Sequence, residues 1–176
     1  QGEAAALLRS DSEKNRQFYR KNGFADCSTV GVGQFTAGGG EPLTCAPAEP
    51  EQYDALRRQY APWGLHWGRE GLATQKGWMK LYGGDLWLLG APEQPVGSAA
   101  VSREGETPLV RELLCPEALR TQVLESLCKA LESRELRLAL PGAEPADGLR
   151  TEPMMMARET AEIGLPGEIY TPLAMD

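Results

Sequence analysis

The segment from Pro116 to Ser133 constrains the fold of this chain more than any other part of the sequence. Pro116 stands at a first-turn position, where its missing N–H costs nothing. Apolar residues then recur at helical spacing, and polar or charged residues lie between them. This apolar stripe consists of Leu119, Val123, Leu124, Leu127, Cys128 and Leu131. Because such a stripe has to be buried against another element, we predict a helix over residues 116–133 that packs on one face of a sheet.

Segments with the character of β-strands lie on both sides of this helix. Residues 85–90 and 96–102 flank a turn that contains Pro and Gly, which is typical of a β-hairpin. Further strands are predicted at "PLVRELLC" (108–115), "LRLALP" (136–141), "PMMMAR" (153–158) and "GEIYTPLAM" (167–175), and a helix at 51–60. This order predicts an α+β, or α/β-like, domain around a mixed, mostly antiparallel sheet flanked by helices.

A stretch rich in Gly and Pro, "TAGGGEPLTCAPAEPEQ" (36–52), interrupts the periodic pattern and is interpreted as a linker. We therefore predict a boundary near residue 47, with one unit over 1–47 and a second over 48–176. In the first unit we expect a short strand or helix end at 4–9, a helix at 15–21 and an extended segment at 24–35. The stretch 63–84 remains ambiguous, because its aromatic residues suit a helix and its glycines weaken that prediction.

The composition excludes several classes of function. With 18 Lys and Arg against 25 Asp and Glu the net charge is -7, which disfavours binding to nucleic acid. No apolar run approaches the roughly 20 residues of a membrane-spanning helix, so we expect no membrane association. The four cysteines lack the spacing of a zinc site and are interpreted as free thiols in a reducing cytoplasm. With a single histidine, His66, we expect no metal site.

The stretch "NRQFYRKNGF" (15–24) resembles a motif of the GNAT superfamily of acyl-CoA-dependent N-acyltransferases, in which Asn, a short gap and Phe-Tyr precede Gly-Phe. The resemblance implies a GNAT-like twisted sheet and acetyl-CoA as the co-substrate. It also implies a catalytic role for Tyr19, which would protonate the leaving thiolate, and a cofactor-binding role for Asn15. A positioned hydroxyl is suited to that proton transfer. The alternative is that Phe18 and Tyr19 are core aromatics of a short amphipathic helix.

The order of predicted elements after residue 48 resembles the GNAT order as well. The turn that should hold the cofactor's phosphates, "LLCPEALRTQVLESL", contains no glycine, and Pro116 removes one N–H donor. This unit therefore resembles the degenerate second domain of tandem-GNAT bacterial acetyltransferases, including relatives of the enhanced-intracellular-survival group. The cofactor loop of the first domain would have to lie upstream of residue 1.

These resemblances imply a cytoplasmic, bacterial acetyl-CoA-dependent N-acetyltransferase whose acceptor is a small-molecule or peptide amine. We expect this chain to be a C-terminal portion that is inactive alone, with homo-oligomerisation left open. The alternative is a non-catalytic GNAT-like binding or interaction module. Glu112 is interpreted as a solvated charge at a strand end, with orientation of an amine as the alternative. His66, Trp63 and Trp67 are interpreted as helix packing, with a pocket for an aromatic or cationic group as the alternative.

Overall fold

The computed structural model describes residues 5–10, 12–62, 64, 66–103, 105–142 and 148–159. The helices are α1 (Glu13–Lys21), α2 (Pro50–Tyr60), α3 (Gly68–Leu81), the short 3₁₀ helix η1 (Glu117–Leu119) and α4 (Arg120–Ala130). The strands are β1 (Ala5–Arg9), β2 (Ala25–Thr36), β3 (Cys45–Pro47), β4 (Asp85–Ala91), β5 (Gln94–Arg103), β6 (Pro108–Leu114), β7 (Glu135–Pro141) and β8 (Arg150–Glu159). The strand predicted at 167–175 lies outside the described residues.

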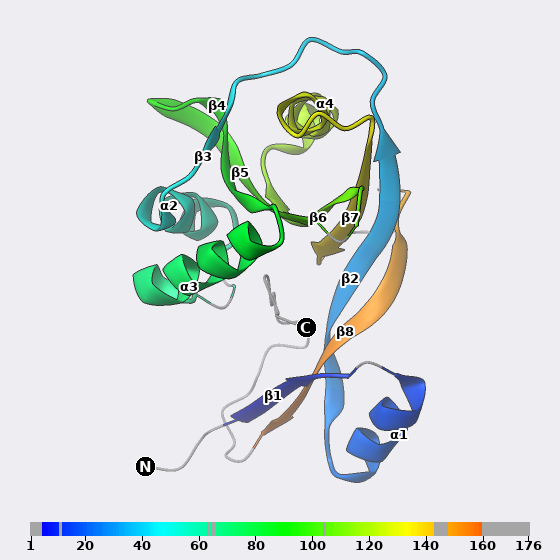
Figure 1. The fold of residues 1–176 in the computed structure, drawn as a ribbon. Coiled ribbons are helices and arrows are strands. Elements are labelled where there is room, and N and C mark those ends of the chain that lie inside the picture. The colour runs from blue at the N-terminus through cyan, green and yellow to red at the C-terminus, as the bar shows by residue number, and fades with distance from the viewer. Residues whose placement is uncertain are drawn as a thin grey trace.

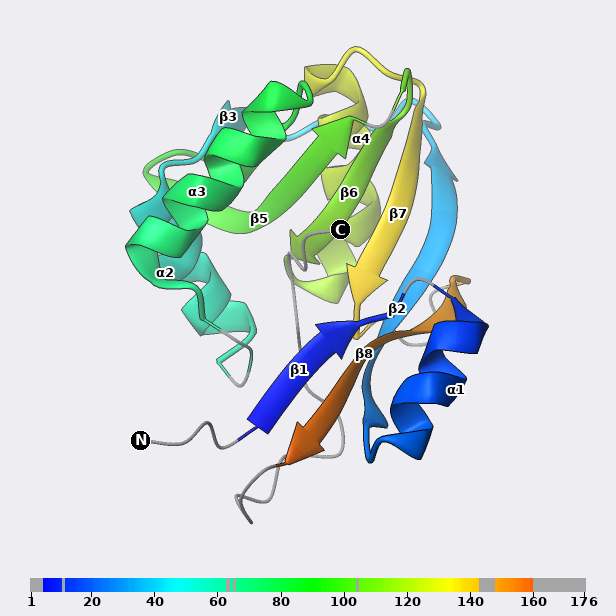
Figure 2. The ribbon, with the colours of Figure 1, turned by 60° about the horizontal axis from the view of Figure 1, so that its bottom comes forward.

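All eight strands form one twisted sheet in the order β1-β8-β2-β7-β6-β5-β4-β3 (Figures 1 and 2). Neighbouring strands are antiparallel except β6 and β7, which are parallel. The predicted fold class, a mixed and mostly antiparallel sheet flanked by helices, is therefore confirmed.

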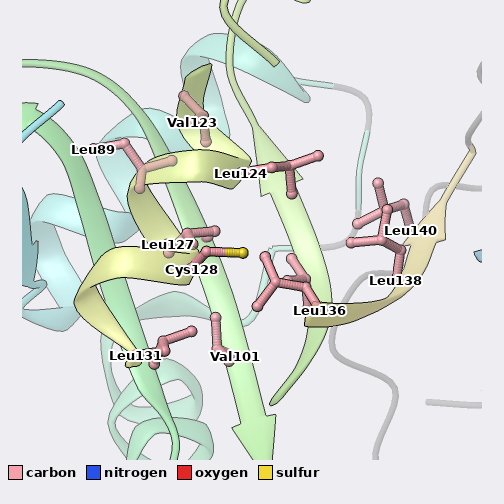
Figure 3. Close-up of a cluster of buried hydrophobic side chains, with 12 residues drawn as sticks. Leu89, Val101, Val123, Leu124, Leu127, Cys128, Leu131, Leu136, Leu138 and Leu140 are labelled. Carbon is pink, nitrogen blue, oxygen red and sulfur yellow. The ribbon is translucent and has the colours of Figure 1, made fainter. Parts of the chain in front are cut away.

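Helices cover both faces of the β3–β7 part of the sheet, because successive side chains of a strand point to opposite faces. On one face, Leu86 and Leu88 of β4 and Ala100 of β5 pack with α2 and α3. On the other face, Leu89, Ala99 and Val101 pack against α4. Figure 3 shows this second core, in which the α4 side chains Val123, Leu124, Leu127 and Cys128 meet Leu136 and Leu138 of β7. The stripe predicted for residues 116–133 is therefore a core-facing surface, although α4 itself ends at Ala130.

The stretch interpreted as a linker contains regular structure, and this prediction is wrong for residues 45–47 and 50–52. Residues 45–47 form β3, which pairs with β4, and α2 begins at Pro50. The residues between β2 and β3 are tied to α4: Gly38 N–H donates to Glu125 Oε1 at 2.5 Å, and Leu43 N–H donates to Ser126 Oγ at 2.7 Å. This Gly- and Pro-containing connection from β2 to β3 is therefore hydrogen-bonded to α4, and Figure 1 shows it passing over that helix.

One sheet runs across the boundary predicted near residue 47. β2, from the first predicted unit, pairs with β7 and β8 from the second. The division into units 1–47 and 48–176 stays a prediction. The ambiguous stretch before β4 forms α3 over Gly68–Leu81, since burial of Leu72 and Met79 outweighs the low helix propensity of its glycines.

Candidate functional site

Both residues singled out by the N-terminal motif lie on α1, four positions apart and hence on neighbouring turns. Asn15 is exposed, and its backbone N–H donates to the Ser12 hydroxyl at 3.3 Å, which caps the helix. Tyr19 is half-buried, and its ring makes edge contacts with Phe18 and Phe24 at centroid distances of 5.5 and 5.7 Å. The catalytic role of Tyr19 and the cofactor-binding role of Asn15 stay predictions.

Asp26 of β2 fixes α1 against the sheet. Its two carboxylate oxygens accept hydrogen bonds from Arg16, which is buried, and from Arg20 at 2.8 Å. Burial alone would raise the pKa of Asp26, but the hydrogen bonds from Arg20 and Arg16 outweigh it and lower this pKa. Arg16 also donates to the carbonyl of Pro153 on β8. The helix that carries Tyr19 is therefore held by charge-assisted hydrogen bonds to β2 and a further bond to β8.

A second candidate region lies where strands β6 and β7 stop pairing with each other. Only Leu109–Arg137 and Val110–Leu138 are bridged between these strands, and their later residues form no bridge with each other. The turn after β6 contains Pro116, which has an extended backbone with ψ of 139° and precedes η1. With no glycine and one N–H missing, this turn offers fewer close backbone donors than a glycine-rich phosphate loop.

A buried polar cluster beside this region was not predicted as such. Glu112 of β6 is 0% exposed, so its interpretation as a solvated strand-end charge was wrong. Its carboxylate accepts hydrogen bonds from the Tyr53 hydroxyl at 2.5 Å and from Arg57 Nε at 3.3 Å. Tyr53 and Arg57 stand four residues apart on α2, and this spacing is the local signal that could have indicated a shared partner.

The cysteine thiols are the other potentially reactive groups, and burial lowers their reactivity. All four cysteines are free. Burial raises the pKa of the Cys45 and Cys128 thiols to about 11, and it also raises the pKa of Cys27 and Cys115. Since the thiolate is the nucleophile, these thiols are poor nucleophiles at neutral pH.

His66 belongs to a partly buried pair with Asp54. His66 Nδ1 lies 3.9 Å from Asp54 Oδ1, and Arg58 donates to the other carboxylate oxygen of Asp54 at 2.7 Å. Trp63 lies outside the described residues. Among the residues that the structure describes, no group of three or more His, Cys, Asp or Glu side chains is placed to hold a metal ion. The described helices are all too short or too polar to cross a membrane.

Four neighbouring strands at one end of the sheet are antiparallel in turn. β1 pairs with β8, β8 with β2, and β2 with β7. β7 continues into the sheet through its parallel partner β6, whereas β1 is the edge strand of the described part of the chain.

Neither a protein-family model nor a curated protein sequence matches this chain. Solved structures do match it. A GCN5-related N-acetyltransferase from Kribbella flavida superposes with a TM-score of 0.60 at 16% identity, over 90% of this chain and 44% of that one. The corresponding structure from Anabaena variabilis gives 0.59 at 12% identity, over 89% and 46%. Eis1 from Mycobacterium abscessus gives 0.58 at 15% identity, over 89% and 47%.

The chain has the GNAT fold. It spans a little under half the length of these three neighbours. Within this fold, β4, β5, β6, α4 and β7 follow the predicted GNAT order, and β2 continues the sheet beyond β7. The segment β1-α1-β2, which carries the motif of residues 15–24, occupies the far end of the same sheet (Figure 2).

Proposed function

We propose that this chain is the C-terminal part of a tandem GNAT protein that transfers an acetyl group from acetyl-CoA to a primary amine. Residues 1–36 complete a catalytic domain whose other strands come from an upstream part of the protein. The segment from β3 to β7 belongs to a second GNAT unit that does not bind acetyl-CoA. A cytoplasmic location belongs to the proposal, since all four cysteines are free, as is usual in reducing compartments.

The run of antiparallel strands β1-β8-β2-β7 carries this proposal. β7 is the point at which the second GNAT unit joins the β2/β8 pair, and β1 lies on the other side of that pair. We expect an upstream strand to pair in parallel with the outer side of β1, as β6 pairs with β7.

The chemistry assigned to α1 follows from the reaction. The amine nitrogen attacks the thioester carbonyl carbon, the C–S bond breaks, and the acyl group passes to nitrogen while the amine loses a proton. The leaving thiolate takes a proton from the Tyr19 hydroxyl, and the proton lost by the amine returns through water to the Tyr19 phenolate. The hydrogen bonds of Asp26 to Arg16 and Arg20 support this role, because they fix the helix that carries the phenol.

The second unit is proposed to be non-catalytic because its turn after β6 does not suit a phosphate. That turn has no glycine, and Pro116 lacks an N–H. The neighbouring carboxylate of Glu112 is engaged by Tyr53 and Arg57 with no exposed surface. We therefore expect this chain alone to bind acetyl-CoA with a dissociation constant weaker than about 10 μM. Titration calorimetry checks this, and tighter binding would contradict it.

The proposal is tested in the full-length protein by following thiol release from acetyl-CoA with a panel of primary amines. Tyr19→Phe removes only the hydroxyl and should lower kcat roughly 100-fold with little change in melting temperature. Phe18→Leu is the matched control, since it changes the neighbouring ring and keeps the hydroxyl. Parent-like turnover in Tyr19→Phe would remove Tyr19 from the mechanism.

The competing function is a non-catalytic GNAT-like binding or interaction module. The buried Tyr53–Glu112–Arg57 cluster fits either function, because the second unit is non-catalytic in both. The same assay separates the two functions. A full-length protein that neither binds nor turns over acetyl-CoA, with every amine tested, would leave the module as the function.

A further inference from the structure

The ring of Tyr19 contacts two other aromatic rings near the C-terminal end of α1. Phe18, the adjacent residue on the helix, is 61% exposed and meets the Tyr19 ring edge to face at a centroid distance of 5.5 Å. Phe24 lies beyond the end of the helix and meets the same ring at 5.7 Å, with 65° between the ring planes. Edge-to-face contacts of this kind favour one relative orientation of the rings. Because Phe24 does not belong to α1, it gives the Tyr19 ring a point of attachment outside the helix.

The turn after α1 brings Phe24 back to Tyr19. The Tyr19 carbonyl oxygen accepts hydrogen bonds from Asn22 N–H at 2.9 Å and from Phe24 N–H at 3.1 Å. Gly23, between these two donors, has a φ of 82°, which glycine adopts without strain. The backbone therefore fixes where the Phe24 side chain starts, and the orientation of the Phe24 ring depends on what the ring itself contacts.

Arg158 of β8 contacts the Phe24 ring. Its guanidinium carbon lies 5.0 Å from the ring centroid, and its Nη1 donates to the Asn22 carbonyl at 3.4 Å. The strand register accounts for this position, because Ala157 pairs with Ala25 and Arg158 and Phe24 lie one step further along the same antiparallel pair. A guanidinium over a ring is attracted by the negative face of the π-system. The side chain that holds Phe24 thus comes from a strand 136 residues beyond Asn22.

We propose that Arg158 is a positioning residue for Tyr19: it holds the Phe24 ring, and Phe24 in turn fixes the orientation of the Tyr19 phenol. This inference rests on the proposed role of Tyr19 as the proton donor. A proton donor is effective only while its hydroxyl stays within hydrogen-bond reach of the atom that it protonates. The ion pairs of Asp26 hold α1 as a whole, whereas the Arg158–Phe24 contact acts on the ring. Small changes in the orientation of a reacting group are costly in rate.

Substitutions of Arg158 in the full-length protein test this role. Arg158→Gln removes the cation from the Phe24 ring and should lower kcat for thiol release roughly 3- to 10-fold, with the KM for acetyl-CoA within about twofold of the parent's. This loss is smaller than that expected for Tyr19→Phe, because the hydroxyl remains and only its orientation is released. Arg158→Lys keeps a cation at this place and should recover most of kcat. Since Arg158 is exposed, both variants should keep a melting temperature close to that of the parent.

The Tyr19→Phe background separates positioning from a general structural effect. If Arg158 acts through the phenol, Arg158→Gln should lower kcat only where the hydroxyl is present, and the double variant should match Tyr19→Phe alone. Arg150→Gln is the matched control, because it removes the same charge near the other end of β8, where Arg150 pairs with Glu152, and it should keep the parent's kcat. Parent-like kcat in Arg158→Gln would overturn the inference. Equal losses in the two backgrounds would overturn it as well.

Nuclear Overhauser effects between the ring protons of Tyr19 and Phe24 report the position of the phenol without any turnover. They should be present in the parent and weakened in Arg158→Gln, and the signals that Tyr19→Phe lacks assign them. Unchanged effects in Arg158→Gln would overturn the inference. Parent-like turnover in Tyr19→Phe, together with weakened effects in Arg158→Gln, would refute the catalytic role of Tyr19 and still support the placement of its ring by Arg158.

Discussion

Arg57 of α2 and Glu112 of β6 form an ion pair in which neither side chain has any exposed surface. The carboxylate also accepts a hydrogen bond from Tyr53, so both of its oxygens are engaged. The pair joins α2 to the strand that precedes the Pro116 turn. A charge taken out of water in this way is tolerated only while its partners remain.

Breaking this pair from one side should therefore be strongly destabilising. We expect Glu112→Leu or Arg57→Met to lower the free energy of unfolding by about 3–5 kcal/mol, because each leaves one buried charge without its opposite. The double variant Arg57→Met/Glu112→Leu should lose less than the sum of the two. Urea denaturation of the three variants gives these values. Arg58→Met, on the exposed side of α2, should change stability by less than about 0.5 kcal/mol.

The α4 stripe gives a second prediction. Leu127 is 0% exposed within the core of Figure 3, so Leu127→Asp would place a carboxylate among apolar side chains. The free-energy cost of burying this carboxylate exceeds the stability of a typical domain. Circular dichroism should therefore show an unfolded protein. Lys129→Asp introduces the same group on the exposed side of α4 and should fold. A folded Leu127→Asp variant would show that the stripe is not the core.

Asp26 provides a prediction with a defined pH dependence. Its pKa is lower in the folded protein than its ordinary value, so its contribution to stability is complete above that ordinary value, 3.8, and is lost as the pH falls through the lowered pKa. Asp26→Asn should cost about 1 kcal/mol at pH 7, a modest figure because Asp26 is partly exposed and screened by water. The difference in unfolding free energy between the parent and Asp26→Asn should become smaller below about pH 4. A difference that is constant from pH 7 to pH 3 would contradict this assignment.

The thiols give a fourth prediction. Burial raises the pKa of Cys45 and Cys128 to about 11, so little thiolate is present at pH 8. We expect these two thiols to react with an aromatic disulfide reagent at least roughly tenfold more slowly in the native protein than in urea. Peptide mapping after timed labelling identifies each site. Equal rates in the native and unfolded protein would show that burial does not protect them.

Local patterns in the sequence were sufficient to predict α4 and the β4–β5 hairpin. The stripe from Leu119 to Leu131 predicted α4, and the segments around residues 85–102 predicted the β4–β5 hairpin, because periodicity and turn chemistry act over a few residues. The motif of residues 15–24 pointed to the GNAT fold that the solved structures share with this chain.

Glu112 and the glycine-rich stretch show where local patterns were insufficient. Nothing near Glu112 in the sequence indicates burial, since its partners Tyr53 and Arg57 lie more than fifty residues away. Residues 37–44 are held partly by α4, some eighty residues later, where Glu125 and Ser126 accept hydrogen bonds from Gly38 and Leu43.

The sequence by itself determined α4 and the strands from β4 to β8, what charge the chain carries, and which motif α1 presents. The tertiary structure alone decided that β8 inserts between β1 and β2, joining the two predicted units in one sheet. The physical reason is that strand pairing depends on backbone hydrogen bonds and on burial against distant segments. Backbone groups are alike in every residue, so the choice of partner is made only when the whole chain is packed together.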